Sequence, residues 1–251
     1  MHIGAATSTG LVRERNEDAA YVGRWLCAVA DGMGGHAAGD VASATVIEAI
    51  RSFDVRADDS TRLTTILGAA VSAANSELTA RVRVDTNLGN MGSTLTAMLW
   101  FGGHFAVANI GDSRAYLLRN RILIPLTEDH VLSNLVANPR PPAIGSYLVR
   151  FLDARPGWSA DLTLHTAHPG DRYLICSDGL SGFVSANAIR DVATDVEGAD
   201  QTVTELVGLA TVAGAPDNVT VIVVDVPDGA WHERVESPLV LGAAAARPVG
   251  V

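Results

Sequence analysis

The sequence contains no lysine, and all 18 of its basic residues are arginines. A chain without lysine cannot form a Schiff base with a carbonyl substrate. It also lacks the lysines with which P-loop NTPases and protein kinases bind nucleotide phosphates. The net charge is −10, whereas binding to nucleic acid or to an anionic membrane needs clustered positive charge. We therefore expect no nucleic-acid partner.

Cysteine and long apolar runs are also scarce. Cys27 and Cys176 each lie within a short apolar run and lack the spacing of a disulfide framework or a zinc site. We expect buried free thiols in a reducing compartment, and hence a cytoplasmic protein. The N-terminus has no secretion-signal pattern, and glycines and polar residues interrupt the apolar stretch 95–110, so we expect no membrane insertion. No sequence feature points to an oligomer, and we expect a monomer.

The composition that remains is typical of a folded domain, with 48% hydrophobic and 18% charged residues in a chain of 251. No internal repeat or low-complexity linker divides it. We expect one domain over residues 1–228 and a C-terminal tail over residues 229–251. Residues 125–169 hold six of the ten prolines, which disfavour helices and central strands. We interpret about 134–158 as a surface flap, with a plain connecting loop as the alternative.

Hydrophobic periodicity predicts strands joined by short turns and helices that come in pairs. Consecutive hairpins favour antiparallel sheets, because parallel strands need long crossovers. The pattern indicates an α+β fold in which helices cover sheet faces. Ser60 is expected to cap the second helix. The expected strands are His2–Thr7, Trp25–Ala30, Ser93–Trp100, His104–Ile110, Ala115–Leu118, Ile122–Leu126, Leu162–Thr166, Arg172–Cys176 and Val219–Val226; the expected helices are Asp40–Phe53, Thr61–Val84, Ser185–Thr194 and Gln201–Ala213.

Several acidic residues stand at the ends of these strands. Asp31 and Asp178 each follow an apolar strand and precede a glycine, and Asp217 stands directly before a strand. A lone buried carboxylate is costly, and several at one sheet edge would repel one another. A divalent cation between them makes the arrangement favourable, and oxygen ligands suit Mg²⁺ or Mn²⁺ better than zinc. The glycine Gly32 would let the backbone come close enough for its carbonyl to be a ligand.

Each acidic motif has a structural alternative when taken alone. Asp-Gly is a common turn pair, and Asp217-Asn218 fits an ordinary turn or cap. The segment 16–18 fits a solvated loop, and 111–114 fits a hairpin turn in which Asp112 pairs with Arg114. Their conjunction in one order along one domain favours a shared site.

This conjunction resembles the bacterial type 2C metal-dependent protein serine/threonine phosphatases, the PPM family, over about residues 4–226. Because eight motifs occur in family order, the resemblance is highly specific. The motifs are Arg13 with Asn16-Glu17-Asp18, Ala30-Asp31-Gly32-Met33-Gly34-Gly35-His36, Gly92-Ser93-Thr94-Leu95-Thr96-Ala97, Asn109-Ile110-Gly111-Asp112-Ser113-Arg114, Leu126-Thr127-Glu128-Asp129-His130, Pro169-Gly170-Asp171-Arg172, Cys176-Ser177-Asp178-Gly179-Leu180 and Asp217-Asn218-Val219-Thr220.

The resemblance implies a sandwich of two antiparallel sheets flanked by helix pairs, with a two-metal centre at one end. Asp31 would bridge two Mn²⁺ or Mg²⁺ ions. The Gly32 carbonyl would bind one ion, and Asp178 and Asp217 the other. The implied reaction is hydrolysis of phosphoserine and phosphothreonine monoesters by a metal-bridging hydroxide, which opposes serine/threonine kinases. The implied partners are phosphorylated proteins and those kinases.

The resemblance also assigns supporting roles. Glu17 and Asp18 would hold metal-bound waters, and Arg13 would bind the substrate phosphate, a task suited to its planar fork. Asp112 is the candidate ligand of a third ion, although Gly182 stands where other relatives carry an acid for that ion.

The chain also departs from the family pattern at the proton donor. Met33 replaces the histidine that animal-type members use as the acid for the leaving group. His36 lies nearby, but we expect it to serve the entry of a helix, with a metal-bound water as the alternative donor.

Two rival functions are compatible with the same fold. A catalytically silent phosphoprotein-binding domain is disfavoured, because such a copy is expected to have lost at least one of Asp31, Asp178 and Asp217. The stress-response or sporulation branch, which acts on phosphorylated anti-anti-sigma factors, usually lacks the intact Arg-x-x-Asn-Glu-Asp segment found at residues 13–18.

Overall fold

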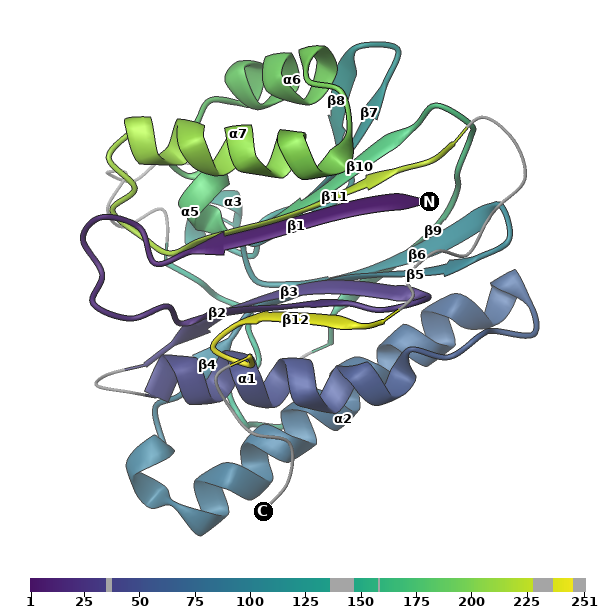
Figure 1. Cartoon of the computed structure of the whole chain (residues 1–251). Helices are drawn as coiled ribbons and strands as arrows, with labels where there is room; N and C mark the ends of the chain where they lie inside the picture. Colours follow the sequence, from purple (N-terminus) through teal and green to yellow (C-terminus); the bar gives the residue numbers. More distant parts are fainter. Residues whose placement is uncertain (35–37, 136–146, 158, 228–236, 246–251) are drawn as a thin grey trace.

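The computed structural model describes residues 1–34, 38–135, 147–157, 159–227 and 237–245. Two antiparallel β-sheets face each other, and helices cover the outer face of each sheet (Figure 1). The smaller sheet has the strand order β1-β11-β10-β7-β8. The larger sheet has the order β12-β2-β3-β5-β6-β9, with the short β4 beside β3. The expected α+β sandwich is confirmed.

The elements of the described residues have the following bounds. The strands are β1 (His2–Ser8), β2 (Asp18–Val22), β3 (Leu26–Met33), β4 (Gly92–Ser93), β5 (Leu95–Phe101), β6 (His104–Ile110), β7 (Arg114–Arg119), β8 (Ile122–Pro125), β9 (Asp161–Thr166), β10 (Arg172–Cys176), β11 (Val219–Asp225) and β12 (Leu239–Gly242). The α-helices are α1 (Ala38–Ile50), α2 (Leu63–Val84), α3 (Leu132–Leu135), α5 (Asp178–Ser181), α6 (Ala186–Asp195) and α7 (Ala199–Val212).

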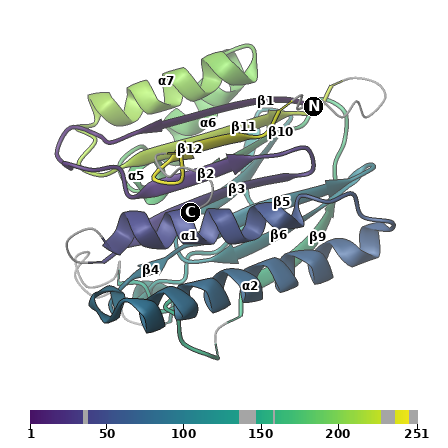
Figure 2. The same ribbon diagram turned by 60° about the horizontal axis from the view of Figure 1, so that its bottom comes forward.

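Three hydrophobic clusters hold the four layers together. Between the sheets, Trp100, Phe105 and Tyr173 pack with ring centroids 4.6, 4.7 and 5.0 Å apart. A second cluster, which includes Leu67, joins the larger sheet to α1 and α2, which lie side by side (Figure 2). A third, which includes Leu206, joins the smaller sheet to α6 and α7. Burying one large apolar side chain contributes about 1.5–3 kcal/mol, so these clusters account for the layered arrangement.

The predicted helices are present, with shifted ends. The apolar residues of α1 and α2 recur every three or four positions, and their buried stripe faces the larger sheet. The predicted cap at Ser60 is wrong, because the Asp59 carboxylate accepts the Thr61 N–H at 2.9 Å and caps a 3₁₀ turn that leads into α2.

Two strands have no signal in the hydrophobic pattern. β2 is buried at every position, so its side chains do not alternate between polar and apolar. β12 lies within the expected tail, yet Leu239 to Gly242 pair with Val22 to Ala19 of β2. The reason is that β2 would otherwise present unpaired backbone groups at the sheet edge. Residues 239–242 therefore belong to the sheet.

The described end of the expected flap is anchored in the fold. Leu152 is buried and exchanges two backbone hydrogen bonds with Ser93, each 2.9 Å long. The Val149 N–H donates to the His130 carbonyl at 2.8 Å. Residues 136–146 and 158 of the expected flap lie outside the described residues.

Both cysteines are free and buried, as the sequence predicts. Burial raises the pKa of each thiol to about 12, so neither Cys27 nor Cys176 is a nucleophile at neutral pH.

None of the helices in the described ranges combines the length and the hydropathy needed to cross a membrane.

Candidate metal and phosphate site

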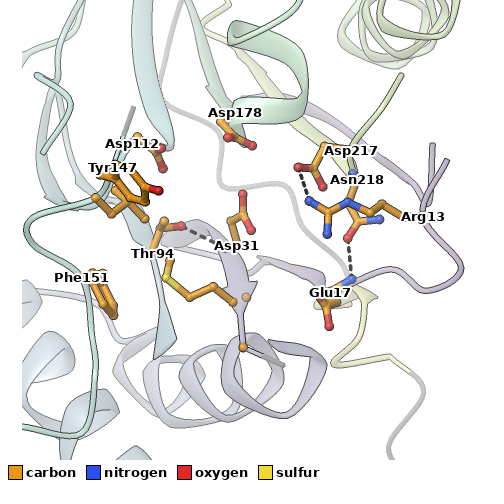
Figure 3. A pocket seen from close by; sticks show the side chains of 14 residues that line it. Arg13, Glu17, Asp31, Thr94, Asp112, Tyr147, Phe151, Asp178, Asp217 and Asn218 are labelled. Carbon is orange, nitrogen blue, oxygen red and sulfur yellow. Dashed lines mark hydrogen bonds and ion pairs between the residues drawn. The ribbon is translucent and has the colours of Figure 1, made fainter. Parts of the chain in front are cut away.

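A cavity of about 510 Å³ opens at one end of the sandwich (Figure 3). Strands of both sheets end or begin there, and they bring the four carboxylates of Asp31, Asp112, Asp178 and Asp217 to its wall. The cavity thus gathers acids that are far apart in the sequence. The other lining residues are Arg13, Glu17, Gly32, Met33, Gly34, Thr94, Tyr147, Leu148, Phe151 and Asn218.

Asp31 occupies the middle of this arrangement (Figure 3). Its backbone N–H donates to Thr94 Oγ1 at 2.9 Å, and its carbonyl accepts the Thr94 N–H at 2.9 Å. Thr94 Oγ1 also lies 2.8 Å from Ser113 Oγ, so buried hydroxyls fix the end of β3. Burial, and then the charges of Asp18 and Asp178, raise the pKa of Asp31 well above its usual range. The surroundings of Asp31 therefore disfavour the ionised form of its carboxyl group.

Asp178 and Asp112 are in the same electrostatic situation. Asp178 is the first residue of α5, and its buried Oδ1 has no hydrogen-bond partner within the described residues. Burial and the charge of Asp217 raise its pKa. Burial and the charge of Asp178 raise the pKa of Asp112 to about 7. The alternative of an Asp112–Arg114 pair is wrong, because Arg114 forms two hydrogen bonds with Asp129, 2.8 and 2.6 Å long.

Asp217 differs from the other three acids because the chain itself engages both of its carboxylate oxygens. Arg13 Nη2 donates to Oδ2 at 2.7 Å, and the Asn218 N–H donates to Oδ1 at 2.8 Å. Although burial opposes it, the charge of Asp217 raises the pKa of Arg13. Arg13 therefore lies at the cavity as predicted, but its guanidinium is turned to a predicted metal ligand.

Asn218 has a positioning role that the sequence analysis missed. Its side chain accepts the Glu17 N–H at 2.7 Å and donates to the carbonyls of Thr9 and Arg15 at 2.9 and 2.8 Å. These bonds hold the loop that carries Arg13 above the start of β11. The one sequence feature that could have indicated this role is the position of Asn218 directly after the candidate ligand Asp217. An asparagine in a turn, however, commonly forms a hydrogen bond with its own backbone, so this position alone did not indicate a long-range role.

Glu17 and Asp18 lie in different environments. Glu17 lines the cavity, and burial raises its pKa. Asp18 is fully buried in β2 opposite Asp31, and it accepts a hydrogen bond from Ser177 Oγ at 2.7 Å. Its Oδ1 has no partner within the described residues, and burial raises its pKa to about 7. Asp18 thus supports the site from behind the cavity wall.

Gly32 lines the cavity, but the structure gives a different reason for the glycine. A Cβ atom at this position would lie 2.0 Å from the Gly39 carbonyl oxygen, where α1 approaches β3. The close approach of α1 is thus a further reason for a glycine at this position, and the role of the Gly32 carbonyl as a ligand stays a prediction.

Other cavity residues come from two segments whose structure the local sequence does not predict: the expected flap and the glycine-rich segment after Asp31. Tyr147 and Phe151 belong to the expected flap, whose path no local pattern predicts. Met33 lines the cavity, whereas His36 lies outside the described residues. At Gly182, an added Cβ would lie 2.8 Å from the Asp178 carbonyl oxygen, which leaves little room for an acid there.

The donor set fits hard divalent cations, since it offers carboxylate oxygens, and one of them, Asp178 Oδ1, is buried without a hydrogen-bond partner within the described residues. Across the described ranges, no three His, Cys, Asp or Glu side chains already form a finished metal-binding cluster. The acids share one cavity, and Asp217 is turned to Arg13 instead.

The chain belongs to the protein phosphatase 2C family, whose model matches residues 12–214. It is 42% identical to the serine/threonine protein phosphatase PstP of Mycobacterium tuberculosis, over 98% of this chain and 48% of that protein. It is 30% identical to the serine/threonine phosphatase stp of Listeria monocytogenes, over 90% of this chain and 96% of that protein. The chain thus spans about half the length of the mycobacterial relative.

Solved structures show the same fold. The crystal structure of M. tuberculosis PstP/Ppp has a TM-score of 0.83 at 40% identity and covers 90% of this chain and 98% of that one. The PstP catalytic domain in complex with two manganese ions has a TM-score of 0.82 at 40% identity, with the same coverage. MsPP from Mycobacterium smegmatis, in complex with cacodylate, has a TM-score of 0.79 at 33% identity and also covers 90% and 98%.

Proposed function

We propose that the chain is a metal-dependent protein serine/threonine phosphatase, which hydrolyses phosphoserine and phosphothreonine monoesters. The observation that carries this proposal is the convergence of five carboxylates, four aspartates and Glu17, on one cavity, four of them with raised pKa values. Such a group is costly unless divalent cations compensate it. Membership of the protein phosphatase 2C family and the phosphatase relatives support the same function.

The cofactors that suit these oxygen donors are two Mn²⁺ or Mg²⁺ ions, and one relative was solved with two manganese ions. Asp31 would contact both ions, the Gly32 carbonyl one of them, and Asp178 and Asp217 the other. Asp112 would contribute to a third ion. When bound, the ions would activate water for attack on phosphorus and offset the charge of the phosphate.

The chain's own residues orient the substrate and support the acids. Arg13 would bind the phosphate, because its half-exposed side chain at the cavity can turn from Asp217 to a ligand. Glu17 from the cavity wall and Asp18 from behind it would fix the surroundings of the ions. Met33 has no transferable proton, so the leaving alkoxide must be protonated by another group.

The substrates that follow from this function are phosphorylated proteins, which are the products of serine/threonine kinases. We propose that the chain opposes such kinases as a cytoplasmic monomer. The net charge of −10 supports the absence of a nucleic-acid partner.

The test is the release of phosphate from p-nitrophenyl phosphate and from a phosphothreonine peptide, in parallel with EDTA, Mg²⁺ and Mn²⁺. We expect activity that requires added metal and disappears in EDTA. A folded protein that releases no phosphate with either metal would contradict the proposal and favour a phosphoprotein-binding domain.

A further inference from the structure

We propose that Arg13 has a second role besides phosphate binding: it occupies Asp217 in the metal-free protein, and the incoming cation must displace it. The displaced guanidinium then becomes available to the substrate phosphate. This inference rests on the proposed function, because it takes Asp217 as a metal ligand.

The contacts of Asp217 carry the inference. Arg13 Nη2 donates a hydrogen bond to Oδ2 at 2.7 Å, and the Asn218 N–H donates one to Oδ1 at 2.8 Å. A cation that binds through Oδ2 therefore competes with Arg13 for the same atom. Asp178 and Asp31 line the same cavity as this pair. The Arg13 guanidinium thus places one positive charge among the acids of the cavity.

The backbone of the Arg13 loop is fixed, so the exchange depends on the side chain. Asn218 binds the loop at Thr9, Arg15 and Glu17, and the Leu11 N–H donates to the Ala215 carbonyl at 2.9 Å. The Arg13 side chain, by contrast, is 49% exposed. It can turn about its own bonds to reach a phosphate while the loop stays in place.

This arrangement couples the two ligands. A cation on Asp217 frees Arg13, and a phosphate that holds Arg13 frees Asp217, so each ligand favours the binding of the other. Because exposed ion pairs contribute little, we expect a modest effect, about a three- to fivefold change in the affinity for one cation.

The test is a calorimetric titration of Mn²⁺ into the parent protein, Arg13→Ala and Arg15→Ala, without phosphate. Arg15→Ala is the matched control, because this substitution removes the same charge from the same loop. The Arg15 side chain is exposed, and the hydrogen bond from Asn218 goes to the Arg15 backbone carbonyl, which the substitution keeps. We expect Arg13→Ala to bind one Mn²⁺ about three- to fivefold more tightly. We expect Arg15→Ala to stay within about twofold of the parent.

A second measurement guards against a change in folding. The melting temperature in EDTA and in Mn²⁺ should show a larger Mn²⁺-induced rise for Arg13→Ala than for the parent or Arg15→Ala. Equal Mn²⁺ affinities in all three proteins, or an equal gain in both variants, would overturn the inference and leave the proposed function standing. Absence of Mn²⁺ binding in all three would overturn the metal site itself, and the inference with it.

Discussion

Acidic residues at the two ends of the smaller sheet have opposite surroundings and opposite pKa shifts. At the cavity end, Asp112 precedes β7, Asp178 follows β10 and Asp217 precedes β11. At the other end, Asp171 directly precedes β10 and Asp225 is the last residue of β11. The two ends share one sheet and one core, so the contrast isolates what surrounds each carboxylate.

At the end away from the cavity, arginines neutralise the acids. Asp171 is 2% exposed and accepts two hydrogen bonds from Arg119, each 2.7 Å long, and a third from the Tyr173 hydroxyl at 2.7 Å. Arg172 binds Asp225 in the same two-point manner at 2.6 and 2.9 Å. Although burial opposes it, Arg119 lowers the pKa of Asp171. These two acids therefore stabilise the folded sheet through ion pairs.

At the cavity end, burial and mutual repulsion raise the pKa values of Asp112 and Asp178, and also that of Asp31 on β3 of the larger sheet, and the Asp217 pair is partly exposed. The direction of the pKa shift therefore separates acids that arginines already neutralise from acids whose ionised form a bound cation would stabilise. Four substitutions or conditions test this separation, in order of decreasing effect.

The largest effect is expected for Asp178→Asn. Loss of a carboxylate that we propose as a metal ligand should lower kcat/KM about a thousandfold, because the metal would contribute several kcal/mol to the transition state. The unfolding free energy in EDTA should stay the same or rise, since the substitution removes repulsion at the cavity. Phosphate release and urea unfolding measure the two quantities. A variant that keeps most of its activity would refute the assignment of Asp178.

The counterpart at the paired end is Asp171→Ala, which leaves Arg119 without its partner. Breaking such a pair typically costs about 3 kcal/mol. We expect the unfolding free energy, measured by urea unfolding, to fall by that amount. The kcat/KM of the folded fraction with Mn²⁺ should be unchanged. A large loss of kcat/KM at unchanged stability would mean that the two ends are not functionally distinct.

The opposite pKa shifts predict opposite pH dependences in EDTA. The pKa of Asp112 rises from 3.8 to about 7 on folding, so its stabilisation is complete below the unfolded pKa and is lost as the pH rises through about 7. The pKa of Asp171 is lowered, so its stabilisation is present above the unfolded pKa and is lost as the pH falls.

Urea unfolding in EDTA between pH 5 and pH 8 tests the cavity acids. The unfolding free energy should fall as the pH rises, and Asp112→Asn should reduce the fall by about 2 kcal/mol. Saturating Mn²⁺ should remove the fall, because the cation replaces the proton. An unfolding free energy that rises over this range in EDTA would contradict the raised pKa values.

The smallest effect is expected for Arg13→Ala at saturating Mn²⁺. Loss of one charged contact to phosphate should raise KM about tenfold, which corresponds to ~1.4 kcal/mol, and should change kcat less. Steady-state kinetics on the phosphothreonine peptide separates the two constants. A change confined to kcat would mean that Arg13 acts in another step.

The sequence predicted the α+β class, most of the strands and the four principal helices. Amphipathic segments reveal themselves locally, because a half-buried helix or strand repeats its apolar positions at its own period. The acids of the cavity were also visible, since Asp31, Asp178 and Asp217 stand at the ends of apolar strands. β2 escaped because every position is buried, and β12 because its four residues are bound only through a distant partner.

The sequence by itself determined which chemical groups the site could contain: carboxylates, an arginine, and no lysine. Only the tertiary structure decided how they meet. Arg13 contacts Asp217 across 204 residues, and Asn218 holds Glu17 across 201. It also placed Asp18 behind the cavity wall. Such choices depend on burial and on the charges that other strands bring near, and a local stretch of sequence contains neither.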